Sequence, residues 1–210
     1  MYKLLIGFIL VLTVTAKFGF DASAGPFTAD SMKCMKENNY VYAIFRAHQQ
    51  IGRVDPNAVA NVKAALAGGI DDVDVYIYPC VKCNDPKEQV IRTVNALKGL
   101  NYRRIWLDIE RQGWNLDTKE ANRRFVSDMF EEAPKHGKVV GVYTSSAEWS
   151  QIVGNDWTAG AKFPLWWPRW DAKPTLDNFQ PFAGWNACVM KQYDHNKNLC
   201  GVNFDPNYKQ

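Results

Sequence analysis

Two carboxyl groups stand close together near the middle of the chain, in the segment RIWLDIE at residues 104–110. Successive side chains of a β-strand point to opposite faces, so Asp108 and Glu110 share one face with their Cα atoms about 6.5–7 Å apart. Charge repulsion and apolar surroundings each raise the pKa of a carboxyl group. An acid that stays protonated near neutral pH can protonate a leaving oxygen, and two acids with different pKa values are what glycoside hydrolysis uses.

The residues around this pair favour a functional site over a solvent-exposed strand edge that has no chemical role. A solvated strand edge could also carry two acids without any chemistry. Here Ile105, Leu107 and Ile109 occupy the opposite face, and Trp106 shares the face of the acids. This pattern is typical of a strand buried on both sides, which favours a site at its carboxyl end.

Two further aspartates are predicted to lie at strand ends. Asp21 ends the predicted strand 17–21, and Asp205 follows the predicted strand 202–204. The first and last strands of a closed barrel are neighbours, so both aspartates could reach the same mouth as Asp108 and Glu110. The alternative is that each is a cap or turn residue, which is the commoner role of a lone aspartate at a strand end.

The elements that must position these acids alternate between strand and helix. Five β-α units are followed by three strands without helices, which predicts an α/β fold: a compact, irregular TIM-like β/α barrel of about eight strands and five helices. An open doubly wound sheet is the alternative, but the glycine-rich turn of a dinucleotide site is missing after the first strand. The predicted strands are 17–21, 40–46, 73–78, 104–110, 139–143, 164–167, 189–193 and 202–204; the predicted helices are 28–39, 55–67, 85–97, 117–135 and 145–152.

The first 16 residues are predicted to be a secretory signal peptide. A positive start is followed by an apolar run of 11 residues from Leu4 to Val14 and by a small residue, Ala16, at which cleavage is expected. Residues 17–210 then form a single domain that is secreted or enters the lumen of a digestive vacuole or lysosome. No later apolar run reaches about 18 residues, so no membrane association is expected after cleavage.

Charge and motif content narrow the partners. The formal net charge is +3 and no long basic run is present, which argues against nucleic-acid binding. The three histidines have no metal-ligand spacing, and neither a P-loop nor a GxSxG motif occurs, so we expect no metal and no cofactor. We expect a monomer.

The five cysteines are interpreted as disulfide partners because an oxidising compartment favours disulfides. Cys188 and Cys200 flank a segment that resembles two short strands and a turn, which predicts a bond between them. One cysteine of the pair Cys80 and Cys83 is expected to bond with Cys34, leaving one thiol free.

Aromatic side chains are candidates for contact with sugar rings. Tyr143, Trp166, Trp167 and Trp170 could stack on pyranose faces, although aromatic residues are more often part of the core. Trp166 and Trp167 are adjacent, so only one of them can point into the barrel.

Six short motifs are spread along the chain: GFDAS (19–23), LDIE (107–110), GVYTS (141–145), LWW (165–167), KQY (191–193) and VNFDPN (202–207). They occur in the order found in glycoside hydrolase family 25, the Chalaropsis-type lysozymes, and the resemblance spans nearly the whole predicted mature chain. The last motif departs from the family's usual Val-Asp-x-Asn. The resemblance implies a compact barrel whose last strands lack helices, and hydrolysis of the β-1,4 bond between N-acetylmuramic acid and N-acetylglucosamine in the glycan strands of peptidoglycan.

The resemblance also implies roles for individual residues. Glu110 resembles the general acid, and Asp108 resembles its partner, which assists through the acetamido group of the substrate or stabilises the positive transition state. Asp21 and Asp205 resemble supporting acids. Tyr143, Trp166, Trp167 and Tyr193 are the expected substrate contacts.

The sequence therefore predicts a secreted lysozyme used for antibacterial defence or for digestion of bacteria. Two alternatives remain. One is a chitinase-like hydrolase assisted by the acetamido group, although such enzymes usually carry a longer acidic run before the glutamate. The other is a non-catalytic glycan-binding or signalling protein on the same barrel.

Overall fold

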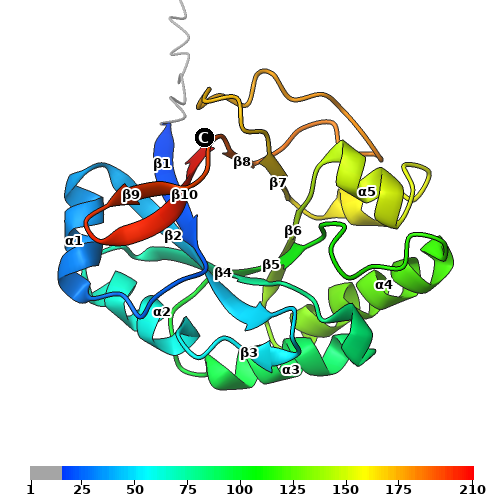
Figure 1. Cartoon of the computed structure of the whole chain (residues 1–210), viewed down its shortest axis with the longest axis horizontal. Helices are drawn as coiled ribbons and strands as arrows, with labels where there is room; N and C mark the ends of the chain where they lie inside the picture. The colour runs from blue at the N-terminus through cyan, green and yellow to red at the C-terminus, as the bar shows by residue number, and fades with distance from the viewer. Residues whose placement is uncertain (1–15) are drawn as a thin grey trace, which may run out of the picture.

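The chain folds into a closed barrel, and the computed structural model describes residues 16–210. Eight strands follow one another around the barrel in the order β1-β10-β8-β7-β6-β5-β4-β2, and pairing of β1 with β2 closes it. The predicted leader lies outside the described residues apart from Ala16, so its cleavage stays a prediction. Figure 1 shows the ring of strands with helices on its outside. The barrel strands are β1 (Lys17–Ala22), β2 (Tyr40–Gln49), β4 (Asp72–Ile77), β5 (Arg104–Asp108), β6 (Val139–Tyr143), β7 (Leu165–Pro168), β8 (Met190–Gln192) and β10 (Val202–Lys209).

Strand direction is uniform except in β10. Neighbouring strands from β1 through β2 and round to β8 are parallel, whereas β10 is antiparallel to both β8 and β1. Two short strands extend the barrel: β3 (Arg53–Val54) pairs with β2, and β9 (Lys197–Leu199) forms a hairpin with β10. The barrel is therefore a mixed one, closed by a single reversed strand.

The helices cover only part of the outer surface. Each of the first five parallel strands is followed by a helix, whereas within residues 16–210 no α-helix follows β7 or β8, and a long loop takes its place (Figure 1). Local sequence explains where helices begin, because the side chains of Thr28 and Ser145 accept hydrogen bonds from the first turns of α1 and α5. The prediction of five helices and helix-free last strands is confirmed. The helices are α1 (Ala29–Glu37), α2 (Ala58–Ala67), α3 (Pro86–Ala96), α4 (Lys119–Lys135) and α5 (Ser146–Ile152).

The core has two layers that follow the alternation of strand side chains. Ile105 and Leu107 pack outward against the helices, while Trp106 lies inside the barrel. Inside, Trp106 and Tyr143 both pack on Trp166, with ring centroids 5.7 and 4.4 Å apart. These aromatic side chains fill the interior of the barrel below its carboxyl end.

The disulfides differ from the prediction. Cys34 of α1 bonds with Cys200 at the turn of the β9–β10 hairpin, and Cys80 bonds with Cys83, so the predicted bonds of Cys188 with Cys200 and of Cys34 with Cys80 or Cys83 are wrong. Cys188 is a buried free thiol. The reason is that β8 pairs with β7 and β10 while β9 pairs with β10, so Cys188 and Cys200 do not face each other across a hairpin.

No helix within residues 16–210 combines the length and the apolar character that crossing a bilayer requires.

Candidate active site

All four predicted acids meet in one pocket. Asp21, Asp108, Glu110 and Asp205 line a cavity of about 270 Å³ at the carboxyl end of the parallel strands. This is the end at which β/α barrels carry their active sites. The pocket is also lined by Ser23, Arg46, Tyr76, Tyr78, Tyr143, Trp166, Trp170 and Gln192.

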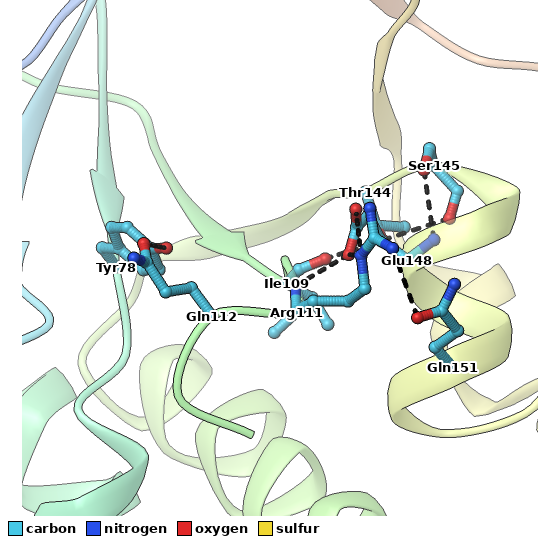
Figure 2. Close-up of polar contacts among 8 residues, drawn as sticks. All are labelled: Tyr78, Ile109, Arg111, Gln112, Thr144, Ser145, Glu148 and Gln151. Carbon is cyan, nitrogen blue, oxygen red and sulfur yellow. Dashed lines mark hydrogen bonds and ion pairs between the residues drawn. The ribbon is translucent and has the colours of Figure 1, made fainter. Parts of the chain in front are cut away.

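Strand β5 delivers the central pair of acids. The strand ends at Asp108, but the chain continues along β6, because the Ile109 amide donates to the Tyr143 carbonyl at 2.9 Å. The Thr144 hydroxyl donates to the Ile109 carbonyl at 2.8 Å, as Figure 2 shows. Hydrogen bonding to the neighbouring chain segment therefore continues to Ile109, one residue beyond the regular strand. Alternation places Asp108 and Glu110 on the pocket side, as the sequence predicts.

The second pair of acids is held across the seam between β1 and β10. The prediction that Asp205 follows the last strand is wrong. Asp205 lies within β10, directly opposite Asp21 in the antiparallel register. Reversal of β10 explains the difference, because the early residues of an antiparallel strand reach the mouth that a parallel strand reaches at its end. Gln192 and Asn207 donate to Asp21 Oδ2 at 2.8 and 2.7 Å.

Burial raises the pKa of every acid in this pocket. For Asp21 burial and the charge of Asp205 raise the pKa to about 8, against the hydrogen bonds from Gln192 and Asn207. Burial likewise raises the pKa of Asp205, and burial with the nearby charge of Glu110 holds the pKa of Asp108 well above its usual range. The pKa of Glu110 is also raised, first by burial. The pocket therefore keeps protons on carboxyl groups at a pH where isolated ones would be ionised.

Asp108 has an unpaired oxygen. Its side chain is buried, with 7% of the residue exposed, and Oδ1 has no hydrogen-bond partner among the described residues. A buried polar atom without a partner is unfavourable by about 1–3 kcal/mol. A ligand with an N–H group could supply the missing donor.

Comparison with known proteins agrees with this geometry. The sequence model of the family described as lysozyme-like protein 1 matches residues 13–193. The chain is 39% identical over 208 residues to the probable GH family 25 lysozyme 2 of Dictyostelium discoideum, covering 98% of this chain and 97% of the relative. It is 36% identical over 211 residues to the probable GH family 25 lysozyme 4 of the same organism, covering 99% and 98%.

The chain belongs to glycoside hydrolase family 25. The fold agrees, since the bacterial lysozyme from Streptomyces coelicolor superimposes with a TM-score of 0.75 at 19% identity, covering 93% of this chain and 92% of that one. The protein is thus a glycoside hydrolase, and its pocket of acids is the candidate catalytic centre of this family 25 enzyme.

Three of the five aromatic residues predicted to contact sugar rings line the pocket of the family 25 enzyme and two do not. Tyr143, Trp166 and Trp170 line it, and the Trp166 indole donates to Asn207 Oδ1 at 2.7 Å. Trp167 points out of the barrel and packs edge-on against Phe179, and Tyr193 lies beside Phe18, outside the pocket lining. For Trp167 the reason is strand alternation, which allows only one residue of the adjacent pair to face inward.

The sequence interpretation missed Gln192 as a site residue. Met190 lies inside the barrel and Lys191 faces outward, where it pairs with Asp171 at 2.7 Å. The same alternation brings Gln192 inward, so the signal was present in the strand pattern. Its absence from the predicted site reflects its neutral side chain, which carries no catalytic signature of its own.

The loop that follows Glu110 is anchored on both sides of the pocket. Arg111 pairs with Glu148 of α5 at 2.9 Å, and its amide donates to the same carboxylate at 2.7 Å. On the other side the Tyr78 hydroxyl donates to Gln112 Oε1 at 2.8 Å, and Figure 2 shows both contacts. These contacts hold the backbone next to Glu110 and so limit the positions that its carboxyl group can reach.

A second cavity continues the pocket across the β9–β10 hairpin. It measures about 310 Å³ and shares Asp21, Ser23, Tyr76 and Asp205 with the first. Asn196, Lys197 and Asn203 line its far side. The Cys34–Cys200 bond ties this hairpin to α1, so the wall of the enlarged cleft is covalently anchored.

Proposed function

We propose that the protein is a lysozyme that hydrolyses the β-1,4 bond between N-acetylmuramic acid and N-acetylglucosamine in peptidoglycan. The observation that carries the proposal is the convergence of Asp21, Asp108, Glu110 and Asp205 in one pocket at the carboxyl end of the barrel. Membership of a family of lysozymes supports the same substrate. The formal net charge of +3 falls to +2 when the predicted leader, which contains Lys3 and no acidic residue, is removed, and a positive charge suits approach to an anionic bacterial wall.

Glu110 is assigned the role of general acid. Burial raises the pKa of its carboxyl group, and the charges of Glu148 and Asp205 act in the same direction, against Tyr143 and Arg111. A protonated Glu110 can transfer its proton to the glycosidic oxygen as the bond to the anomeric carbon breaks. Glu110 is less buried than Asp108, which suits a group that must meet the leaving oxygen.

Asp108 is assigned the role of positioning the acetamido group of the substrate. Its unpaired Oδ1 can accept the acetamido N–H. This contact would direct the acetamido carbonyl oxygen to the anomeric carbon, where it forms a bond as the leaving oxygen departs with the proton of Glu110. The Glu110 carboxylate then removes a proton from water, whose oxygen replaces the acetamido oxygen at the anomeric carbon.

The pair Asp21 and Asp205 supplies partial negative charge below the sugar. Burial and mutual repulsion raise the pKa of Asp21 to about 8, so the two acids together carry less than two negative charges near neutral pH. This charge stabilises the positive charge that develops on the sugar ring in the transition state.

Clearance of a bacterial wall suspension by Glu110→Gln and by the wild type tests the assignment. Loss of the general acid should reduce the rate by about 10²–10⁴-fold. Glu131→Gln is the matched control, because Glu131 is exposed on α4 and should leave the rate unchanged. Equal clearance by Glu110→Gln and the wild type would show that Glu110 is not the acid.

The same preparations distinguish the two alternatives. A chitinase-like enzyme would cleave chitin oligosaccharides and leave muropeptides intact. A non-catalytic glycan-binding protein would bind walls saturably without releasing reducing ends. Release of muropeptides with reducing ends at N-acetylmuramic acid is the result expected here.

We also infer that the enzyme is secreted or delivered to a digestive compartment and acts as a monomer in antibacterial defence or digestion of bacteria. The apolar run at Leu4–Val14 and two disulfides support export through an oxidising compartment. Amino-terminal sequencing of the exported protein should begin at Lys17, the first residue of β1. A start at Met1 in the exported protein would contradict this inference.

A further inference from the structure

Within residues 16–210, Arg46 is the only cationic side chain that lines the pocket of the four acids. The side chains of β2 alternate, so that Tyr42 and Ile44 lie inside the barrel while Phe45 and Ala47 pack outward. The same alternation turns Arg46 inward near the carboxyl end of the strand. One positive charge among four carboxyl groups provides a place for an anionic group of a ligand, which the acids alone would repel.

The Arg46 guanidinium is held in place by a buried carboxylate outside the pocket lining. Its Nε donates to Asp55 Oδ2 at 2.7 Å, and its Nη2 donates to the Ser23 carbonyl at 2.8 Å. Asp55 is 3% exposed and also accepts from Gln49 Nε2 at 3.0 Å and from the Asn57 amide at 2.9 Å. Because Asp55 is fixed by these bonds, it fixes the orientation of the guanidinium in turn.

Several N–H groups of Arg46 are left for a ligand. A guanidinium has five N–H bonds, and those to Asp55 and Ser23 use two of them. Nη1 makes no hydrogen bond to any residue in the part of the chain that the structure describes. A guanidinium of fixed orientation with unused N–H groups is suited to binding a carboxylate or a carbonyl oxygen.

The strand order places Arg46 relative to the two acids that act on the sugar in the proposed function. Strands β6, β5, β4 and β2 are consecutive neighbours in the barrel. Asp108 ends β5, and the segment after it is bonded to β6 through the Ile109 amide and to α5 through the Arg111 amide. Glu110, between those two residues, therefore lies on the β6 side of Asp108, and Arg46 lies on the β2 side. Around the wall of the pocket the order is Glu110, Asp108, Arg46.

The groups that these residues would bind follow one another in the same order on the sugar ring. Glu110 protonates the oxygen on the anomeric carbon, and the acetamido group assigned to Asp108 is on the next ring carbon. The third ring carbon carries a lactyl ether in N-acetylmuramic acid and a hydroxyl group in N-acetylglucosamine. The lactyl group ends in a carboxylate or, where a peptide is attached, in an amide. The backbones of β5 and β2 are two strand spacings apart, about 10 Å, which is comparable to the width of a sugar ring with its substituents.

We propose that Arg46 binds the lactyl carbonyl oxygen of N-acetylmuramic acid and thereby selects this sugar over N-acetylglucosamine at the cleaved bond. The proposal rests on the proposed function, which supplies the places of the anomeric carbon and the acetamido group. Arg46 is then a specificity-determining residue, and Asp55 is the residue that positions it. The charge of Arg46 also offsets the repulsion between a lactyl carboxylate and the four acids.

Binding of two tetrasaccharides to the Glu110→Gln protein, which should hydrolyse them slowly, tests the proposal. One alternates N-acetylglucosamine with peptide-free N-acetylmuramic acid, and the other is a chitin tetrasaccharide, which lacks the lactyl groups. Addition of Arg46→Met should weaken binding of the alternating tetrasaccharide by about 10–100-fold, as expected for loss of a hydrogen bond between charged groups. Binding of the chitin tetrasaccharide should stay unchanged. NMR titration measures both dissociation constants and extends to weak binding.

Three further variants separate recognition of the lactyl group from folding. Arg53→Met is the matched control, because Arg53 is an exposed arginine of β3 that bonds to Gln49 outside the pocket, and it should change neither dissociation constant. Arg46→Lys keeps the charge and should recover part of the affinity for the alternating tetrasaccharide. Arg46→Gln takes the place of Arg46→Met if loss of the partner of Asp55 prevents folding, because the glutamine amide can still donate to Asp55.

Two outcomes would overturn the proposal. One is equal weakening of both tetrasaccharides, which would show that Arg46 acts on the pocket as a whole and not on the lactyl group. The other is unchanged binding of the alternating tetrasaccharide. The titration needs no turnover, so a wild-type protein that binds the alternating tetrasaccharide but fails to hydrolyse walls would contradict the proposed function and leave this test intact.

Discussion

Two equally buried aspartates, at opposite ends of the barrel, differ in how their oxygens are satisfied. Asp74 is 6% exposed near the amino end of β4, and Asp108 is 7% exposed at the carboxyl end of β5. Asp74 accepts from the Arg104 amide at 3.0 Å and from the Trp106 indole at 2.9 Å, with the Arg104 guanidinium 3.9 Å away. Asp108 has an oxygen with no partner and acidic neighbours.

This contrast separates a structural acid from a functional one. The protein supplies donors to Asp74, so folding alone satisfies that carboxylate. At Asp108 a donor is missing, and the most direct source of one is the substrate. Burial raises the pKa of both groups, but at Asp74 the bond from Trp106 and the charge of Arg104 oppose burial, whereas at Asp108 the neighbouring Glu110 and Asp21 reinforce it. Burial by itself therefore does not identify a catalytic acid.

The largest effect that tests the comparison of Asp74 with Asp108 is expected on the activity of an Asp108 variant. Asp108→Asn should reduce wall hydrolysis by about 10²–10⁴-fold, the range typical for loss of a positioned acid or base. The free energy of unfolding should stay the same or rise, because the substitution removes a buried ionisable group that lacks a partner. Turnover assays and denaturant melts on the same preparation measure both. A clear loss of stability with activity retained would reverse the assignment.

A smaller effect, on stability and not on activity, is expected at Asp74, at the other end of the barrel. Asp74→Asn should destabilise the fold by about 1–3 kcal/mol, because an amide cannot satisfy both the Arg104 amide and the Trp106 indole as a carboxylate does. The folded fraction should keep its full rate on bacterial walls. Denaturant melts measure the free energy of unfolding, and the specific activity per folded molecule measures the rate on bacterial walls.

A third effect is expected in the pH dependence of stability, at Asp21. Because the pKa of Asp21 is raised to about 8 in the fold, the folded protein holds this proton more tightly than the unfolded chain does. This contribution is fully present below the unfolded pKa and is lost as pH rises through about 8. Asp21→Asn should therefore flatten the decline in stability between about pH 4 and pH 8. Thermal melts across this range measure the slope, and an unchanged slope would contradict the prediction.

Much of the site follows from local rules that a sequence carries. Alternation along β5 places Asp108 and Glu110 together with Trp106 and away from Ile105 and Leu107, and the structure agrees. The five helices and the helix-free last strands were also predictable, because caps and hydrophobic periods act over a few residues. Family membership likewise rests on motifs that can be recognised along the chain.

Tertiary structure decided what depends on distant partners. The reversed direction of β10 places Asp205 within a strand and opposite Asp21, and it moves the hairpin that carries Cys200 toward Cys34. The two cysteines are separated by 166 residues, and no local pattern encodes such a pairing.

Gln192 is an example within the site of a residue whose role local sequence does not determine. Strand alternation could point its side chain inward, but its role comes from partners on β1, β6, β10 and the loop after β7. By itself the sequence determined which side chains of one strand share a face, since side-chain direction is a property of a single strand. Which of those residues share protons and charge was decided only when the barrel closed, because that depends on distances between strands that are far apart along the chain.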